Sequence, residues 1–256
     1  MALRELALDL AAAVDPVAFT EQAAFQPDPW QAALLRSSAP RTLLLAARQT
    51  GKSTVTSALA LHEALYRPPA LVLLLSPSLR QSGELFRKVI GLYRSIGAPV
   101  PAEAESALRL ELANGSRIVS LPGHEATVRG FSGVRLLVVD EAARVPDELY
   151  YAVRPMLAVS KGRMICLTTP FGKRGFFYEA WTNGGTAWDR VKITAPECPR
   201  ISPEFLAEER AGMGDWWFKQ EYLCEFVETD DQVFAHDLID AALTADVSPL
   251  FGEGSS

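Results

Sequence analysis

The chain has 256 residues, of which 48% are hydrophobic and 22% charged, so it can bury one substantial core and does not have the composition of a disordered protein. Its net charge of −6 argues against a protein that coats nucleic acid over its whole surface, and any DNA contact would need a local basic patch. The hydrophobic runs at 71–75 and 136–139 are too short to cross a bilayer, so we predict buried strands and no membrane partner.

The N-terminal segment 2–14 is hydrophobic but is interrupted by Glu5 and Asp9. This pattern predicts an amphipathic helix rather than a signal peptide. The three cysteines of the chain are too few and too widely separated to indicate a zinc site or a disulfide framework, and they fit a reducing cytoplasm.

Two prolines in the segment 25–31 predict a turn, followed by a helix that begins at Trp30. Gln31 lies in this helix, upstream of the loop described next. Two interpretations of Gln31 stay open. Its amide either pairs with the edge of an adenine through both donor and acceptor, or it faces solvent in an ordinary helix.

A hydrophobic strand from residue 43 runs into a loop that ends in Gly-Lys-Ser and opens a helix over 55–66. In the phosphate-binding pattern G-x-x-x-x-G-K-[ST], backbone N–H groups cradle the phosphates, the Lys reaches the β- and γ-phosphates, and the hydroxyl binds Mg²⁺. Lys52 and Ser53 fill the last two roles. The first Gly is replaced by Ala46, so the prediction depends on the strand–loop–helix context. The expected nucleotide-binding residues are Ala46, Ala47, Arg48, Gln49, Thr50, Gly51, Lys52, Ser53 and Thr54.

A second buried strand is predicted at 70–76, followed by a long helix over 79–96 that carries four cations. These cations form either a solvated helix face or a surface that faces DNA. They are Arg80, Arg87, Lys88 and Arg94. Alternating hydrophobic residues at 108–112 and 117–121, on either side of an Asn-Gly pair, predict a β-hairpin added to a mostly parallel sheet.

The hydrophobic strand 135–139 is closed by Asp140 and Glu141. In P-loop ATPases the first acid at the end of such a strand holds Mg²⁺, and an adjacent Glu can polarise the attacking water. We assign these roles to Asp140 and Glu141. The alternative is a pair of helix N-cap residues.

Another buried strand is predicted at 163–168, ending in Thr168 and Thr169. Ligands bind at the carboxyl ends of strands in open α/β sheets, so this hydroxyl pair either senses the γ-phosphate or the attacking water, or it only forms a turn. Helices are expected on both sides of this strand, at 147–157 and 176–181.

A last strand is predicted at 191–194, and short helices follow at 203–211, 216–226 and 237–243. We therefore divide the chain into a P-loop ATPase core with the N-terminal helix and the segment 25–31 (1–195), a helical lid (196–250) and a disordered tail (251–256). The predicted fold class is α/β, a P-loop NTPase with a mostly parallel central sheet flanked by helices.

Together these segments resemble the ATPase domain of the large terminase subunit, the motor of tailed bacteriophages, over residues 25–234. Five stretches carry the resemblance, in chain order. They are the adenine-binding segment 25–31, the Walker A loop 46–53 with its Ala46 and Arg48, the Walker B pair 140–141, the coupling motif 168–170 and the lid sequence 220–226.

The resemblance implies a RecA-like fold of the ASCE type, with ATP and Mg²⁺ as ligands. It implies that Arg48 is a cis arginine that senses the γ-phosphate or helps the lid to respond. Arg129 matches the arginine that some members offer to the ATP of a neighbouring subunit as a trans finger, which stabilises charge in the transition state. The alternative for Arg129 is a structural or DNA-contacting role.

As a terminase motor, the protein is expected to push double-stranded DNA into a procapsid in the cytoplasm of an infected bacterial host. Its expected partners are further copies in a homo-oligomeric ring, a pentamer, together with a portal protein, a small terminase subunit and a nuclease. Family members usually continue into an RNase H-like nuclease, and the chain stops where that domain would begin. We therefore expect no DNA cleavage by this chain.

Two other functions fit the sequence less well than the motor does. A helicase-like or DNA-repair P-loop ATPase is disfavoured, because two-domain helicases need a second RecA-like core and this chain has room for one. A non-catalytic nucleotide-binding module is disfavoured because both Lys52 and Glu141 are present.

Overall fold

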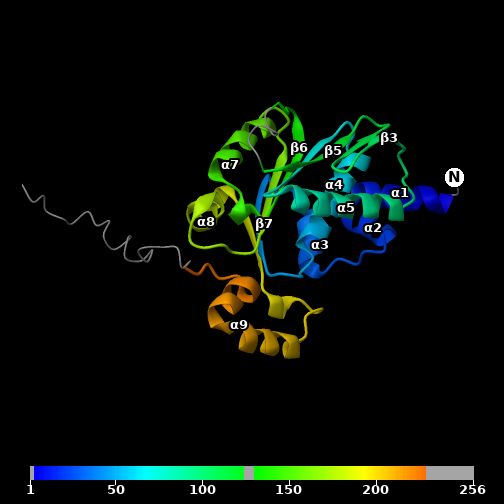
Figure 1. The fold of residues 1–256 in the computed structure, drawn as a ribbon. Coiled ribbons are helices and arrows are strands. Elements are labelled where there is room, and N and C mark those ends of the chain that lie inside the picture. The colour runs from blue at the N-terminus through cyan, green and yellow to red at the C-terminus, as the bar shows by residue number, and fades with distance from the viewer. Residues whose placement is uncertain (1–2, 124–129, 229–256) are drawn as a thin grey trace, which may run out of the picture.

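The computed structural model describes residues 3–123 and 130–228. These residues form an eight-stranded mixed sheet with helices on both faces, and α9 lies in a separate lobe below it (Figure 1). The strands are β1 Arg41–Ala46, β2 Leu71–Ser76, β3 Ala102–Glu105, β4 Arg109–Leu112, β5 Arg117–Pro122, β6 Val134–Asp140, β7 Arg163–Thr168 and β8 Asp189–Ile193. The α-helices are α1 Leu3–Val14, α2 Pro16–Gln22, α3 Pro29–Arg36, α4 Lys52–Tyr66, α5 Leu79–Ser95, α7 Asp147–Val153, α8 Gly175–Asn183 and α9 Pro203–Leu223.

The strand order is β3-β4-β5-β2-β6-β7-β1-β8. The pairs β5/β2, β2/β6, β6/β7, β7/β1 and β1/β8 are parallel, and only β3/β4 and β4/β5 are antiparallel within the described sheet. This arrangement confirms the α/β class, the mostly parallel sheet and the hairpin predicted at 108–121. The strand β7 lies between β1 and β6, so it stands between the phosphate loop and the acidic pair 140–141.

Side chains of the central strands alternate between two cores. Leu43 and Leu45 of β1 pack with residues of α7, α8 and α9, whereas Leu44 and Ala46 pack with residues of α3, α4 and α5. A strand covered on both faces needs a continuous hydrophobic run rather than an alternating one. This requirement explains the sequence of β1, in which every residue after Arg41 is buried.

Several element boundaries differ from the prediction. The two helices expected at 203–211 and 216–226 form one element, α9, which is kinked at Gly214 (φ 80°, ψ 165°) and ends at Leu223, because Cys224 takes a left-handed conformation (φ 55°). The helix expected at 147–157 ends as α7 at Val153 and continues as the 3₁₀ turn 154–157. The exposed edge strand β3 was not predicted, because its sequence Ala-Glu-Ala-Glu has no hydrophobic signal. The helix expected at 237–243 and the tail 251–256 lie outside the described residues.

The N-terminal helix is confirmed as α1, but Ala12 is its one buried side chain among the described residues. Leucines such as Leu3 and Leu10 are exposed. The helix is held by polar contacts instead, since Asp9 accepts a hydrogen bond from the Tyr66 hydroxyl and the Ala12 carbonyl lies 2.9 Å from His62 Nε2. No helix in the described ranges is long and hydrophobic enough to span a membrane.

Candidate functional site

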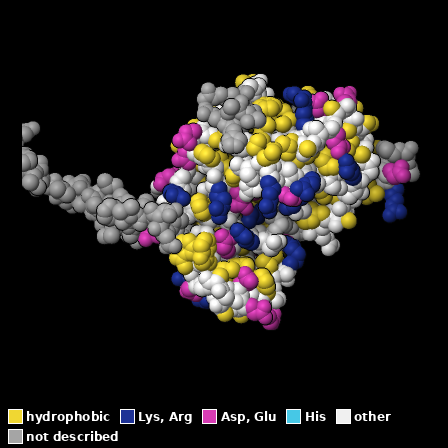
Figure 2. Space-filling model, in the orientation of Figure 1, with side chains coloured by type: hydrophobic (Ala, Val, Ile, Leu, Met, Phe, Trp, Pro, Cys, Tyr) yellow, Lys and Arg dark blue, Asp and Glu magenta, His cyan; other side chains and the backbone are white. Residues whose placement is uncertain are grey.

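A cleft of about 390 Å³ lies over the loop that joins β1 to α4, at the carboxyl end of the parallel strands. Its described lining is the loop itself and two residues from elsewhere: Arg48, Gln49, Thr50, Gly51, Lys52, Ser53, Thr54, Lys88 and Glu141. Figure 2 shows Lys and Arg side chains gathered along the middle of the visible face, above the lobe of α9.

The second half of the loop, from Gln49, is shaped by backbone conformations typical of an anion-binding loop. Gln49 and Gly51 both have positive φ, 61° and 87°, and α4 begins directly after them at Lys52. Successive backbone N–H groups in such a loop, at a helix N-terminus, form an anion-binding concavity. A Cβ at position 51 would lie 2.6 Å from Gln31 Nε2, so the site requires glycine for space as well as for conformation.

Lys52 is buried and folds back onto the loop. Its Nζ donates to the carbonyls of Ala46 at 2.9 Å and Ala47 at 3.1 Å. Burial lowers the pKa of this ammonium, since removal from water disfavours the charged form. An ammonium has three donors, so one remains for a phosphate oxygen in the cleft.

Ser53 and the Walker B acid lie side by side. The Ser53 hydroxyl donates to Asp140 Oδ2 at 3.3 Å, although 87 residues separate them in the chain. Burial, and then the charge of Glu141, raises the pKa of Asp140 to about 6. A hydroxyl and a carboxylate oxygen are the ligand types that Mg²⁺ prefers, so these two residues fit the predicted metal site.

Glu141 turns into the cleft because its backbone takes a left-handed conformation (φ 49°) at the end of β6. Its N–H donates to Asp140 Oδ1 at 2.9 Å. The following 3₁₀ turn, 142–144, has no hydrogen bond from a capping side chain. Glu141 thus occupies the N-cap position of this turn, but its side chain does not cap it, which argues against capping as the role of the acidic pair.

Thr168 and Thr169 are buried at the end of β7. Thr168 Oγ1 accepts a hydrogen bond from the N–H of Ala143 at 3.3 Å and donates to the carbonyl of Thr169 at 2.7 Å. The hydroxyl thus joins the strand end to the turn that follows Glu141. Its role in sensing the γ-phosphate stays a prediction.

Two segments close to or within α9 contact the phosphate loop. Arg48 Nε lies 2.5 Å from Glu221 Oε2, and the Arg48 N–H donates to the Glu221 carbonyl at 3.3 Å. Arg200 donates to the Thr50 carbonyl at 3.1 Å and to Asp28 Oδ1 at 2.6 Å. Sequence reasoning placed Glu221 in the lid sequence 220–226 but did not pair it with the loop, and it missed Arg200, because no local pattern marks a contact between segments about 150 residues apart or more.

Gln31 is buried, so the interpretation that it faces solvent is wrong. Its Oε1 accepts from the Asp28 N–H at 2.8 Å, and its Nε2 donates to the Thr50 carbonyl at 3.1 Å. The amide therefore supports the phosphate loop from α3. Pairing with adenine stays a prediction, and it would require the amide to exchange these partners.

The four cations of α5 do not act as one surface. Arg87 pairs with Glu84 and Arg94 with Glu105, as expected of a solvated face. Lys88 instead lines the cleft, where its charge lowers the pKa of Asp140 in opposition to burial. Sequence reasoning named Lys88 but did not place it at the nucleotide site. Arg129 lies outside the described residues.

The comparisons with known proteins agree with this geometry. The sequence profile of the family described as "Terminase large subunit, T4likevirus-type, N-terminal" matches residues 43–241. The large terminase subunit of Thermus virus P23-45 is 28% identical, and the alignment covers 85% of this chain and 52% of that protein. The chain therefore spans about half the length of this relative.

Two solved structures share the fold. The large terminase ATPase domain of Thermus phage P74-26 superposes with a TM-score of 0.72 at 24% identity, covering 82% of this chain and 97% of that one. The large terminase of a thermophilic bacteriophage, in complex with ATP-γ-S, has a TM-score of 0.59 at 12% identity, covering 82% and 52%. At these identities the likeness establishes the α/β P-loop architecture.

Proposed function

Because this chain belongs to the family of large terminase subunits of the T4-like virus type, we propose that it hydrolyses ATP with Mg²⁺ to drive double-stranded DNA into a procapsid. One observation carries the proposal. The phosphate loop, the hydroxyl of Ser53 and the carboxylates at 140 and 141 are brought to one cleft by three separate elements, β1, α4 and β6. The complex of a thermophilic bacteriophage terminase with ATP-γ-S supports the choice of nucleotide.

Each residue has a role that follows from its place. Lys52 binds the β- and γ-phosphates, and Ser53 and Asp140 hold the metal, which when bound neutralises charge on the phosphate oxygens. Glu141 accepts a proton from the water that attacks the γ-phosphate. Because Arg48 is paired with Glu221 of α9, a γ-phosphate that attracts Arg48 would weaken this link and release the lid, proposed to span 196–250.

In the assembly, Arg129 acts as a trans finger on the neighbouring subunit of a homo-oligomeric ring, a pentamer, docked on the procapsid in the host cytoplasm. The ring works with a portal protein and a small terminase subunit, and DNA cleavage belongs to a nuclease domain or to a separate nuclease. Thr168 and Thr169 relay the state of the nucleotide to the turn after Glu141.

The function is tested by Glu141→Ala, with Glu148→Ala as the matched control, since Glu148 is an exposed acid on α7 nearby in the chain. We expect turnover to fall by a factor of about 10² or more, the range for loss of a general base. Binding of a fluorescent ATP analogue should stay within about twofold of wild type, because a residue that acts only in the transition state leaves ground-state binding unchanged. Turnover equal to that of the Glu148→Ala control would contradict the proposed role.

A further inference from the structure

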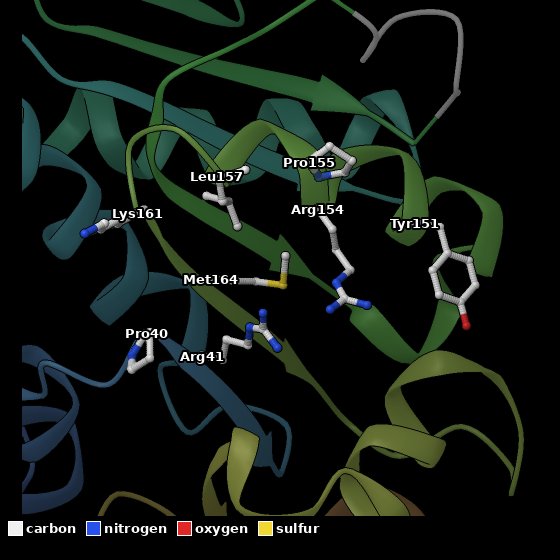
Figure 3. Close-up of a pocket in the computed structure, with 10 residues that line it drawn as sticks. Pro40, Arg41, Tyr151, Arg154, Pro155, Leu157, Lys161 and Met164 are labelled. Carbon is white, nitrogen blue, oxygen red and sulfur yellow. The ribbon is translucent and has the colours of Figure 1, made fainter.

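A second hollow, of about 550 Å³, lies at the opposite end of the sheet (Figure 3). It is built at the amino ends of β1 and β7, where Arg41 lies beside Met164 in the parallel register. The phosphate loop follows the carboxyl end of the same strand β1, six residues away. At a rise of about 3.3 Å per residue, the two sites are roughly 17 Å or more apart.

The charge of this hollow is all of one sign. Its lining includes Arg41, Arg154 and Lys161 and contains neither Asp nor Glu. Within the described chain, none of these three cations forms an ion pair. Exposed arginines elsewhere, such as Arg36 and Arg87, do take a carboxylate partner. In a chain of net charge −6, a group of cations without acids is therefore a local feature rather than a consequence of composition.

Two of the cations face one another. Figure 3 shows the guanidinium groups of Arg41 and Arg154 directed toward each other, below Met164 in this view, whereas Lys161 extends away from them. Arg154 also lies over the ring of Tyr150, at 5.4 Å from its centroid. Guanidinium groups stay protonated at any physiological pH, so this pair presents two positive charges to the hollow.

The backbone that carries these groups is fixed. Arg41 is part of the central sheet, and Arg154 begins the 3₁₀ turn that follows α7. At Gly162, beside β7, a Cβ would lie 2.0 Å from the Val134 carbonyl, so the tight packing of the backbone there leaves no room for a side chain. The backbone that carries the two arginines therefore needs no rearrangement on binding, and the planar forks of their guanidinium groups match the oxygens of a phosphate.

We propose that this hollow is a second phosphate-binding site, separate from the nucleotide cleft, in which Arg41 and Arg154 hold a phosphodiester group of the DNA backbone. The ligand chemistry is that of a phosphate oxyanion, and the choice of DNA as its source rests on the proposed function. Guanidinium contacts to phosphate oxygens carry no base information. The site therefore grips DNA of any sequence.

The test compares wild type with the double variant Arg41→Gln/Arg154→Gln. The control is Arg4→Gln, which removes an exposed arginine on α1. Binding to a labelled duplex of about 30 base pairs is measured by fluorescence anisotropy, without nucleotide, between about 50 and 200 mM salt. We expect the affinity of the double variant to fall about tenfold and its salt slope to decrease by about 1, the value for one lost phosphate contact. The control should bind like wild type.

Three outcomes would overturn the proposal. In the first, the double variant binds DNA as tightly as the control does. In the second, the wild type binds no DNA at the lowest salt, and in the third, the Arg4→Gln control loses as much DNA affinity as the double variant. Binding of orthophosphate, measured by calorimetry, that is lost in the double variant while DNA affinity stays unchanged would assign the site to free phosphate instead. The charge-conserving variant Arg41→Lys/Arg154→Lys should have an unchanged melting temperature and keep most of the salt slope. This result would show that the double variant to Gln loses DNA affinity through loss of charge and not through unfolding. ATP turnover of the double variant without DNA should equal that of wild type. A negative result in the DNA-binding test is therefore distinct from a failure of the ATPase proposal.

Discussion

At the scale of single residues, the proposed nucleotide site lowers the stability of the fold. Asp140 is buried beside a second carboxylate, and its pKa is raised to about 6 from an ordinary value of 3.8. Between these two values the folded protein binds more protons than the unfolded chain does, so this residue lowers the stability of the fold as pH rises through that window. In the metal-free protein the buried Asp140 carboxylate therefore destabilises the folded state at neutral pH.

We therefore predict that Asp140→Asn stabilises the metal-free protein at pH 7.5, by about 2 to 3 kcal/mol, since one pKa unit corresponds to about 1.4 kcal/mol. The gain should shrink to about half by pH 5, where the folded wild type already holds the proton. Urea unfolding in EDTA at the two pH values measures this difference. A gain independent of pH would show that packing, not titration, is responsible.

Lys88 gives a second prediction at this scale. It lines the cleft with Lys52 and Glu141 and has no ion pair within the described residues, so its charge is available to the phosphates. We expect Lys88→Gln to lower kcat about tenfold, because a charge that faces the transferred phosphoryl group is strongest in the transition state. Steady-state ATPase assays measure the change.

The control for Lys88 is its neighbour on the same helix. Arg87→Gln removes an equal charge that is already paired with Glu84 outside the cleft, so its kcat should match that of wild type. Equal losses in both variants would mean that the helix surface, not the cleft, matters. A rise in KM alone would assign Lys88 to ground-state binding.

How well the sequence predicts a residue depends on where its partners lie. Lys52 and Ser53 were predicted because their function comes from a contiguous loop with a fixed spacing. Gln31 and Lys88 have their partners in other segments, and a sequence in isolation does not state which helix face meets the loop. Both residues were named from the sequence, but only the fold shows which residues they contact.

At the scale of elements, the same limit applies to α9. Its two halves were predicted as separate helices, at 203–211 and 216–226, and of the two glycines between them, Gly212 and Gly214, the structure places the kink at Gly214 alone. The conformation of Gly214 (φ 80°, ψ 165°) is open essentially only to glycine. The kink precedes Glu221, which pairs with Arg48 of the phosphate loop, so the shape of α9 positions that contact.

The two glycines provide a matched pair of variants. Gly214→Ala should destabilise α9 by about 1 to 3 kcal/mol through backbone strain, whereas Gly212→Ala should stabilise it by about 0.5 to 1 kcal/mol, as for glycine in a helix interior. A Cβ at either position would have no atom within 4 Å, so the backbone alone decides the sign. Hydrogen exchange of the α9 amides measures both effects, and equal protection in the two variants would contradict the proposed strain.

At the scale of the whole molecule, the order of the strands brings the site together. Hydrophobic runs predicted the strands other than β3, but not which of them are neighbours, since β1 pairs with β7 across more than a hundred residues. On its other side β7 pairs with β6, with Leu167 opposite Asp140, and this pairing puts Thr168 beside the turn that follows Glu141. The family resemblance, rather than periodicity, supplied the expectation of a RecA-like sheet.

The proposed role of Arg129 links ATP turnover in the cleft to the assembly of subunits. Its described lining provides Lys52 and Lys88 as cations, while Arg48 is held by Glu221. If Arg129 completes the site of a neighbouring subunit, ATP turnover per subunit should rise steeply with protein concentration, since the finger is worth a factor of about 10³ or more. Arg129→Ala should hydrolyse ATP at the low rate of dilute wild type at every concentration. Colorimetric phosphate assays over the range of assembly, with oligomeric state followed by sedimentation, measure this dependence. A flat specific activity in wild type that assembles would assign the whole reaction to one subunit, because every catalytic group would then act in cis.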